Sequence, residues 1–202
     1  MKVAIIDYGM GNVASVEKAI NFLGVSSIIT KDKVEIESAD FIILPGVGAF
    51  NQGMINLQES GLVELLNLEV KDKKKPFMGI CLGMQLLAEK GYEPKPCKGL
   101  GWIEGEVKRI DEPGRSIPHL GWNEISTKEN SLISEFDKKD FYFIHSYHFD
   151  VKNPIMVVAT VKYGNDYVAA IQKDNIFAAQ FHPEKSQTSG LALLNTFFEF
   201  YA

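Results

Sequence analysis

The sequence contains few cysteines, no long apolar run and no excess of positive charge. Two cysteines among 202 residues do not make a disulfide framework, and neither a C-x-x-C spacing nor a helical H-E-x-x-H pattern offers a metal site. No run of roughly 18 consecutive apolar residues predicts a membrane span. Lys and Arg number 21 against 26 Asp and Glu, and this net charge of −5 disfavours a nucleic-acid or anionic-membrane surface. We therefore expect a protein of the reducing cytoplasm with no metal, nucleic acid or membrane partner.

The first half of the chain alternates short apolar runs with amphipathic stretches. The apolar runs predict strands at Val3–Ile6, Ser26–Thr30, Phe41–Leu44 and Phe77–Ile80. The spacing of apolar residues between them predicts helices at Asn12–Leu23, Leu57–Val70 and Leu82–Lys90. Asp7 follows the first apolar run at once, which favours a strand over a signal peptide. Strands and helices in alternation predict a parallel sheet with helices on both faces.

The second half consists mostly of short strand candidates. They lie at Glu104–Ile110, Trp122–Ser126, Phe141–Ser146, Met156–Val161, Val168–Gln172 and Phe177–Phe181. Few helices separate them, so we expect antiparallel additions to the sheet, followed by a last helix at Ser189–Tyr201. The sequence therefore predicts one α/β domain over residues 1–202, with a mixed, mostly parallel central sheet.

The sharpest local signal surrounds Cys81. An apolar strand runs into Gly79-Ile80-Cys81-Leu82-Gly83 and then into a predicted helix, the cysteine version of a nucleophile elbow. Such a turn strains the backbone of the nucleophile and leaves room only for small residues two positions before and after it. The helix dipole would stabilise negative charge on the sulfur, and the N–H of Leu82 would bind an oxyanion. A buried structural cysteine is the alternative, and Cys97 lies in a loop without this context.

A nucleophilic cysteine needs a base, and the base needs a group that orients it. His182 ends an apolar strand, and Glu184 lies two residues further on, so an extended backbone would project both side chains to the same side. The carboxylate would then accept from one imidazole nitrogen while the other faces the thiol. A surface turn is the alternative for His-Pro-Glu alone, but together with the elbow it becomes a candidate Cys–His–Glu triad.

Two glycine-rich loops follow predicted strands. Gly9–Ala14 formally matches G-x-G-x-x-A, but Asp7 and Tyr8 precede it and no acidic residue ends the second strand, so we expect no dinucleotide cofactor. The second loop, Pro45-Gly46-Val47-Gly48, lies at the carboxyl edge of the predicted sheet. Its N–H groups would suit an oxyanion, and a plain tight turn is the alternative.

Six motifs, in this order, resemble the class I, triad-type glutamine amidotransferases, and more narrowly the glutaminase subunits of imidazole glycerol phosphate synthase from histidine biosynthesis. The motifs are Asp7–Asn12, Pro45–Gly48, Gly79–Leu87, Pro118–Asn123, His145–Tyr147 and Gln180–Ser186. The cysteine elbow and His-Pro-Glu mark the superfamily, and the first, fourth and fifth motifs mark the subfamily. The match runs essentially end to end, and it implies a glutaminase with the class I amidotransferase fold and no cofactor.

The resemblance also implies a role for each motif residue. Cys81 would attack the side-chain amide of L-glutamine and form a thioester, His182 would transfer the proton, and Glu184 would orient His182. The oxyanion would bind the N–H of Leu82 and the peptide between Val47 and Gly48. Glutamine itself would be held by Gly48, Gln85, His145, Ser146 and Tyr147. Water would then release glutamate.

A partner follows from the same resemblance. Members of the family pass ammonia through a channel to a (βα)8-barrel cyclase subunit within a heterodimer. The residues toward that partner would be Asn12, Pro118, His119, Trp122, Asn123 and Lys185. Leu120, Trp102 and His148 depart from the usual family pattern, which leaves open a paralogous glutaminase that serves another synthetase, for instance in surface amino-sugar biosynthesis. A catalytically idle regulatory partner with the same fold is the remaining alternative.

Overall fold

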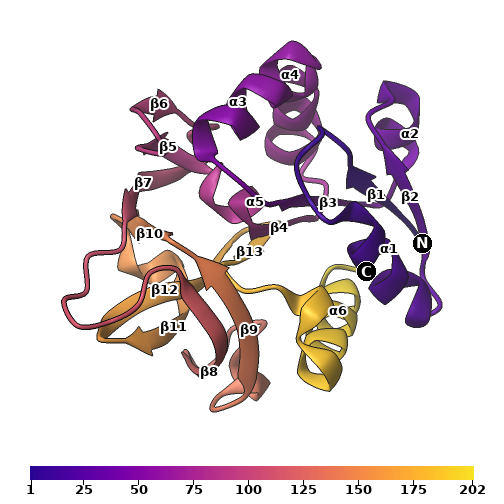
Figure 1. The fold of residues 1–202 in the computed structure, drawn as a ribbon. Helices are drawn as coiled ribbons and strands as arrows, with labels where there is room; N and C mark the ends of the chain where they lie inside the picture. The colour runs from indigo at the N-terminus through magenta and orange to yellow at the C-terminus, as the bar shows by residue number, and fades with distance from the viewer.

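The computed structural model describes all residues from Met1 to Ala202, and a nine-stranded sheet in the order β2-β1-β3-β4-β13-β12-β11-β8-β9 is its largest element (Figure 1). The strands of this sheet are β1 Lys2–Ile6, β2 Ser26–Thr30, β3 Phe41–Gly46, β4 Phe77–Cys81, β8 His119–Thr127, β9 Asp140–His145, β11 Val157–Tyr163, β12 Asn165–Lys173 and β13 Ile176–Ala179. The helices are α1 Val13–Phe22, α2 Lys33–Ser38, α3 Phe50–Glu59, α4 Leu62–Leu66, α5 Leu82–Gln85 and α6 Gln187–Tyr201. None of the helices combines the length and the apolar character needed to cross a membrane.

Parallel and antiparallel pairing meet at β13. Strands β2, β1, β3, β4 and β13 pair in parallel, whereas β12, β11, β8 and β9 extend the sheet by antiparallel pairs. The predicted mixed α/β sheet with antiparallel additions from the second half is confirmed. Parallel pairs make up half of this sheet rather than most of it, because the strands of the second half are joined by turns and short loops instead of crossover helices.

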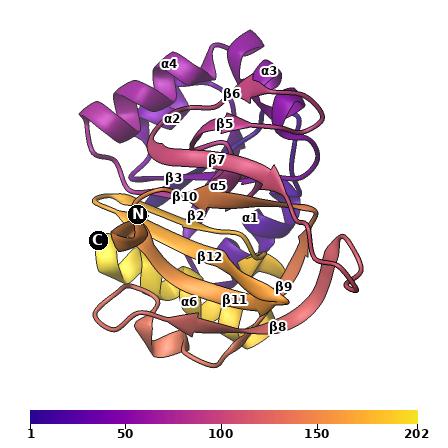
Figure 2. The same ribbon diagram turned by 90° about the vertical axis from the view of Figure 1, so that its left-hand side faces the viewer.

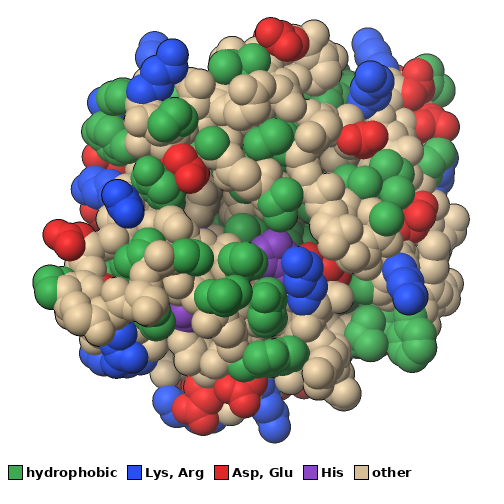
Figure 3. Space-filling view, in the orientation of Figure 1, with side chains coloured by type: hydrophobic (Ala, Val, Ile, Leu, Met, Phe, Trp, Pro, Cys, Tyr) green, Lys and Arg blue, Asp and Glu red, His purple; other side chains and the backbone are tan.

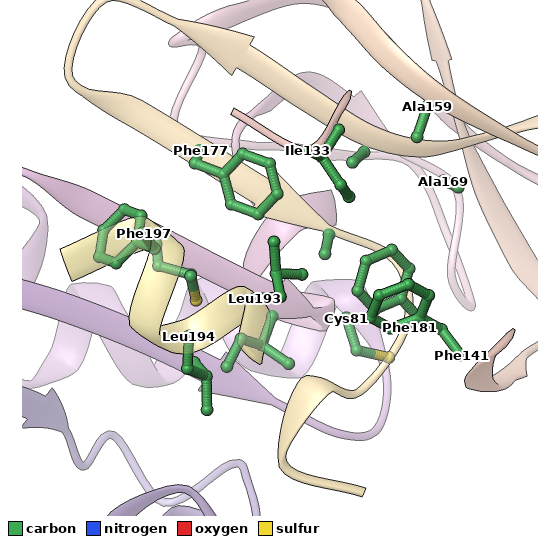
Figure 4. Close-up of a cluster of buried hydrophobic side chains, with 14 of the residues drawn as sticks. Cys81, Ile133, Phe141, Ala159, Ala169, Phe177, Phe181, Leu193, Leu194 and Phe197 are labelled. Atoms are coloured by element: carbon green, nitrogen blue, oxygen red, sulfur yellow. The ribbon is translucent and has the colours of Figure 1, made fainter. Parts of the chain in front are cut away.

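Two hydrophobic cores cover the two faces of the parallel strands, as predicted. Alternate residues of β1 divide between them, since successive side chains of a strand point to opposite faces. Val3 and Ile5 pack in the core that includes α1 and α6, while Ala4 and Ile6 pack with α2, α3 and α4. Figure 4 shows side chains of α6 meeting Phe177 inside the first of these cores. The carboxyl edge of the parallel strands is left for the site, as in other open α/β sheets.

A second sheet, in the order β10-β7-β5-β6, lies beside the first (Figure 2). Its strands are β5 Ala88–Gly91, β6 Cys97–Lys98, β7 Ile103–Arg109 and β10 Tyr147–Val151. The prediction of one helix over Leu82–Lys90 is therefore wrong, because α5 ends at Gln85 and the chain then enters β5. A Cβ at Gly91 would overlap the ring of Phe50, so β5 packs very closely against α3. The strand predicted at Glu104–Ile110 also belongs to this sheet, as β7, and not to the main one.

The helix predicted over Leu57–Val70 is interrupted. Gly61 has a φ of +68°, a left-handed conformation that ends one helical segment and starts α4. A wider, π-helical segment follows α4 and carries Glu69 into the interior. Lys73 and Lys75 pair with this buried carboxylate at 2.6 and 2.8 Å. Apolar spacing alone does not reveal such a change of helical pitch.

Candidate active site

Cys81 lies at the carboxyl end of β4, on a sharp turn into α5. Its backbone has φ 55° and ψ −109°, which is costly for a residue with a side chain. The flanking glycines are required by close packing. A Cβ at Gly79 would lie 2.9 Å from the carbonyl oxygen of Gly83, and one at Gly83 would overlap the carbonyl oxygen of Leu44. The strained turn expected from the sequence is present, although α5 is a single turn and offers fewer aligned peptide dipoles than expected.

The sulfur of Cys81 sits between an aromatic wall and polar groups. Figure 4 shows the side chain beside Phe141 and Phe181, and it is 7% exposed. Nε2 of Gln180 lies 3.6 Å from the sulfur, and the carbonyl oxygen of Ile144 lies 3.9 Å from it. An inert structural cysteine would be surrounded by apolar groups alone, whereas this thiol faces an amide donor.

His182 follows β13, and Glu184 orients its ring. Nδ1 of His182 lies 2.8 Å from Oε1 of Glu184, and both side chains are 2% exposed. The expected extended spacer is absent, because Pro183–Lys185 forms a 3₁₀ turn that brings the carboxylate back to the ring. Ser186 holds this turn, since its hydroxyl donates to the carbonyl oxygen of His182. The predicted pairing of His182 with Glu184 is thus made by a turn and not by strand alternation.

The charge on His182 depends on Cys81. Burial lowers the pKa of His182, but the negative charge of a Cys81 thiolate, together with the hydrogen bond to Glu184, outweighs burial and raises this pKa to about 10. The imidazolium form of His182 is therefore favoured while the sulfur beside it is charged. When the sulfur loses its charge, the strongest of the raising effects disappears. The imidazole then returns toward the neutral form, which accepts a proton.

A cavity of about 330 Å³ opens beside Cys81, at the small end of the range for ligand pockets. Figure 3 shows a hollow on this face, with a histidine at its edge and hydrophobic side chains around it. The cavity is lined by Val47, Gly48, Ala49, Cys81, Leu82, Gln85, Glu93, Pro118, Ile144, His145, Ser146 and Tyr147. It brings together the residues that the sequence assigns to the nucleophile, the oxyanion and glutamine. His182 and Glu184 do not line it.

The polar groups of the cavity have a defined direction. Nε2 of Gln85 uses both hydrogens within the protein, donating to the carbonyl oxygen of Tyr147 at 3.0 Å and to Oε1 of Gln180 at 2.9 Å. Only Oε1 of Gln85, an acceptor, is then free. Glu93, which belongs to none of the motifs in the sequence, supplies the only carboxylate of the lining. Burial raises the pKa of Glu93 although the N–H of Phe50 bonds to it. These acceptors suit a cationic group.

The loop after β3 requires glycine next to the cavity. Gly48 has a φ of +100°, and a Cβ there would lie 3.0 Å from Cε of Met10. The Gly9–Ala14 segment packs against this same loop, because a Cβ at Gly11 would lie 3.3 Å from the carbonyl group of Pro45. The glycines of both segments therefore serve the close packing of two backbones beside Cys81.

The residues predicted to face a partner are mostly exposed. Pro118 lies at the cavity, and Asn12, Trp122 and Lys185 are exposed. Tyr142 joins two of them, because its ring packs edge-on against Trp122 at 6.0 Å and lies 5.8 Å from Nζ of Lys185. Trp122, Tyr142 and Lys185 therefore form one surface patch, and the half-buried Asn123 lies next to Trp122 in the chain.

His119 does not present its side chain on this surface, and the expectation that it faces a partner is wrong in that respect. It is 1% exposed and stacks on Phe143 and Tyr163, with ring centroids 4.8 and 4.1 Å away. Strand alternation explains the difference, since Leu120 and Trp122 point outward from β8 while His119 points inward. Its ring reaches the surface only through Asn123, whose Nδ2 lies 2.6 Å from Nε2 of His119.

Two further sequence features lie outside the site. Cys97 is partly buried in β6, where its thiol lies 3.4 Å from the carbonyl oxygen of Lys98, and it does not line the cavity. No group of three or more His, Cys, Asp and Glu side chains is arranged to hold a metal ion.

Comparison with known proteins gives the family. The family described as glutamine amidotransferase class-I matches residues 4–200. The imidazole glycerol phosphate synthase subunit HisH 1 of Campylobacter jejuni (strain RM1221) is 49% identical, over 96% of this chain and 98% of its own length. The HisH subunit of Aquifex aeolicus (strain VF5) is 46% identical, over 98% of this chain and 96% of its own length.

Solved structures show the same fold at lower identity. The structure of PurLQS from Thermotoga maritima matches with a TM-score of 0.79 at 17% identity, covering 100% of this chain and 99% of that one. A crystal structure of a glutamine amidotransferase matches with a TM-score of 0.74 at 20% identity, covering 98% of each chain. Together with the close relatives, these matches show that the chain belongs to the class-I glutamine amidotransferase family and, within it, to the HisH subunits of imidazole glycerol phosphate synthase.

Proposed function

We propose that this chain is the glutaminase subunit of imidazole glycerol phosphate synthase in histidine biosynthesis, and that it hydrolyses L-glutamine to glutamate and ammonia. The observation that carries the proposal is Cys81 on its strained turn, between the His182–Glu184 pair and a cavity of single-amino-acid size. The relatives named above carry the name of this synthase, and they favour it over a paralogous acceptor. The presence of all three candidate triad residues, Cys81, His182 and Glu184, disfavours an idle regulatory protein.

Glutamine recognition follows from the direction of the cavity's polar groups. The free Oε1 of Gln85 and the carboxylate of Glu93 are acceptors that suit the α-ammonium group. Ser146 and Tyr147 line the same cavity, and their backbone N–H groups would suit the α-carboxylate end. The side-chain amide would then extend toward Cys81, so that the reacting carbon lies next to the sulfur.

In the first half of the reaction, the thiolate of Cys81 attacks the amide carbon of glutamine. The negative charge moves from sulfur to the carbonyl oxygen, where the N–H of Leu82 and the peptide between Val47 and Gly48 stabilise it. His182 donates its proton to the departing nitrogen, which leaves as ammonia, and a thioester remains on the sulfur. Each oxyanion donor of this kind contributes about 3–4 kcal/mol to lowering the barrier.

In the second half, His182 acts as the base. The thioester sulfur carries no charge, so the effect that raises the pKa of His182 to about 10 is lost, and the neutral ring can take a proton from water. The hydroxide attacks the thioester, glutamate leaves, and the thiolate and imidazolium are restored. Glu184 keeps the ring in the same orientation through both halves.

We also propose that ammonia passes to a (βα)8-barrel cyclase subunit in a heterodimer. The surface formed by Asn12, Trp122, Tyr142 and Lys185 beside the cavity is the candidate docking site. Trp122 is 43% exposed and Leu120 is 58% exposed, and large apolar side chains of this kind are typical of protein interfaces. A docked barrel at this place would close the cavity against water.

The test is glutamate release from L-glutamine by the purified chain, alone and with a cyclase subunit and its ribonucleotide ligand. We expect slow release by the isolated chain and strong stimulation by the loaded cyclase. Absence of stimulation, with Cys81 still alkylated by a glutamine-like electrophile, would leave a glutaminase but contradict this partner. Absence of alkylation under both conditions would contradict the glutaminase assignment.

A further inference from the structure

Gln180 is fully buried next to the nucleophile and has no part in the reaction described above. It is 0% exposed, does not line the cavity, and lies two residues before His182. We propose that Gln180 is a positioning residue, which holds the thiolate of Cys81 by an N–H···S hydrogen bond and is itself oriented by Gln85. The inference rests on the proposed role of Cys81 as the nucleophile.

The direction of the Gln180 amide follows from its neighbours, because amide oxygen and nitrogen have nearly the same shape. The carbonyl oxygen of Tyr147 only accepts, so the group of Gln85 that lies 3.0 Å from it is NH₂. The same NH₂ group lies 2.9 Å from the amide of Gln180, which must therefore present its oxygen. The NH₂ group of Gln180 is then directed at the sulfur of Cys81, 3.6 Å away.

A pair of hydrogen-bonded histidines lies on the other side of the Tyr147 carbonyl. Nδ1 of His145 lies 2.8 Å from the carbonyl oxygen of Tyr147 and must donate to it. Nε2 of His145 then accepts from Nδ1 of His119, at 2.9 Å, and Nε2 of His119 accepts from Asn123. One orientation of each side chain satisfies every hydrogen bond in the series from Asn123 to Cys81, with the Tyr147 carbonyl accepting from both His145 and Gln85. A reversed Gln180 would face the NH₂ of Gln85 with its own and turn an oxygen toward the thiolate.

The hydrogen bond from Gln180 favours the charged form of the sulfur without titrating. His182 is the other group that stabilises the thiolate, Tyr8 lies close enough to feel its charge, and Glu93 and His145 line the same cavity. Burial and the negative charge of Cys81 raise the pKa of Tyr8, so its hydroxyl stays protonated. Gln180 lies outside the cavity, so its replacement should change the reactivity of the sulfur and leave glutamine binding nearly unchanged. Replacement of a residue that only fills space would leave the reactivity of the sulfur unchanged.

The experiment uses the full chain with Cys97→Ser, so that iodoacetamide reports Cys81 alone. Gln180→Met keeps the volume without the donor, and Gln180→Glu puts a carboxylate oxygen in its place. The matched control is Gln58→Met, at an exposed position of α3. Since hydrogen bonds to charged groups are among the strong ones, we expect alkylation at pH 7 to slow by about 10- to 100-fold in both Gln180 variants. The pH midpoint of alkylation should rise, and Gln58→Met should match the parent.

With the cyclase partner present, kcat should fall in the Gln180 variants while KM for glutamine changes little. Folded variants whose alkylation rate and pH midpoint equal those of the parent would overturn the inference, even when glutamate release persists. A parent that releases no glutamate with any partner, but whose alkylation still depends on Gln180, would contradict the proposed function alone. If the Glu variant does not fold, Gln180→Met decides, together with Gln85→Leu, which frees the Gln180 amide to turn and should also slow alkylation.

Discussion

The imidazole rings of His119 and His145 share a hydrogen bond of 2.9 Å between Nδ1 and Nε2. The two rings are 1% and 6% exposed, and burial lowers the pKa of His119 to about 4 and that of His145 to about 3. Both rings are therefore neutral at physiological pH, and one donates while the other accepts. The pair joins β8, whose outer side carries Trp122, to the end of β9 beside the cavity.

Acid should destabilise the protein through this pair. In the unfolded chain both histidines titrate near the ordinary value of 6.5, whereas the folded pKa values are depressed. As the pH falls below 6.5, the unfolded chain binds protons first, so the stabilisation is complete above 6.5 and is lost as the pH falls toward about 4 and about 3. Urea unfolding between pH 7.5 and 5 measures the slope. We expect His119→Gln to reduce the proton uptake on unfolding by about one, and an unchanged uptake would contradict the neutral pair.

The central part of the site was predictable because its signals are local. A turn of five residues requires the glycines around Cys81. A Cβ at either glycine would lie too close to neighbouring backbone atoms, so no other residue fits. His182 and Glu184 are two positions apart, so their meeting depends on one short segment. The β-α alternation of the first half likewise indicates its parallel sheet, because each crossover is encoded within a few tens of residues.

The parts that were missed depend on contacts between distant segments. Glu93 lies in a loop without periodicity, and it joins the cavity only because the β5–β6 hairpin packs on α3. Gln180 lies 99 positions from Cys81 in the sequence, and it lies 95 positions from Gln85, whose amide donates to it. The chain after Gln85 has apolar spacing that suits a helix, but pairing with β7 converts it to a strand. None of these contacts between distant segments can be predicted from the local sequence.

Replacement of Glu184 tests the orienting carboxylate. Glu184→Gln keeps an oxygen for Nδ1 of His182 but removes the charge, so we expect kcat to fall by about tenfold, since charge-assisted hydrogen bonds are roughly twice as strong as neutral ones. His182→Ala removes the proton carrier and should cost at least about 100-fold. Initial rates of glutamate release give both values, with Cys81→Ala as the inactive baseline. A Glu184→Gln variant with full activity would show that the carboxylate does not orient His182.

Substitution of Gly48 tests its role in catalysis, and the same substitution at another glycine of positive φ measures the cost of backbone strain alone. Gly48→Ala places a Cβ 3.0 Å from Met10 at a φ of +100°, so the peptide between Val47 and Gly48 must shift, and we expect glutamate release to fall by about 10- to 100-fold. Gly24 has a φ of +75° with nothing near its missing Cβ, and Gly24→Ala is the matched control. Both variants should lose about 1 kcal/mol of stability from the left-handed conformation. Equal activities of the two variants would remove the Gly48 peptide from the oxyanion site.

The exposed ring of Trp122 provides the test of the docking surface. It is 43% exposed and packs edge-on against Tyr142 beside the cavity, so a partner that covers the cavity would bury it. Trp122→Ala should raise the Kd for the cyclase subunit by at least about tenfold, since buried aromatic residues dominate interface energies. Phe22, at the end of α1 and 76% exposed, is the matched control, and Phe22→Ala should leave the Kd unchanged. Titration calorimetry measures both, and equal affinities for the two variants would place the interface on another face of the molecule.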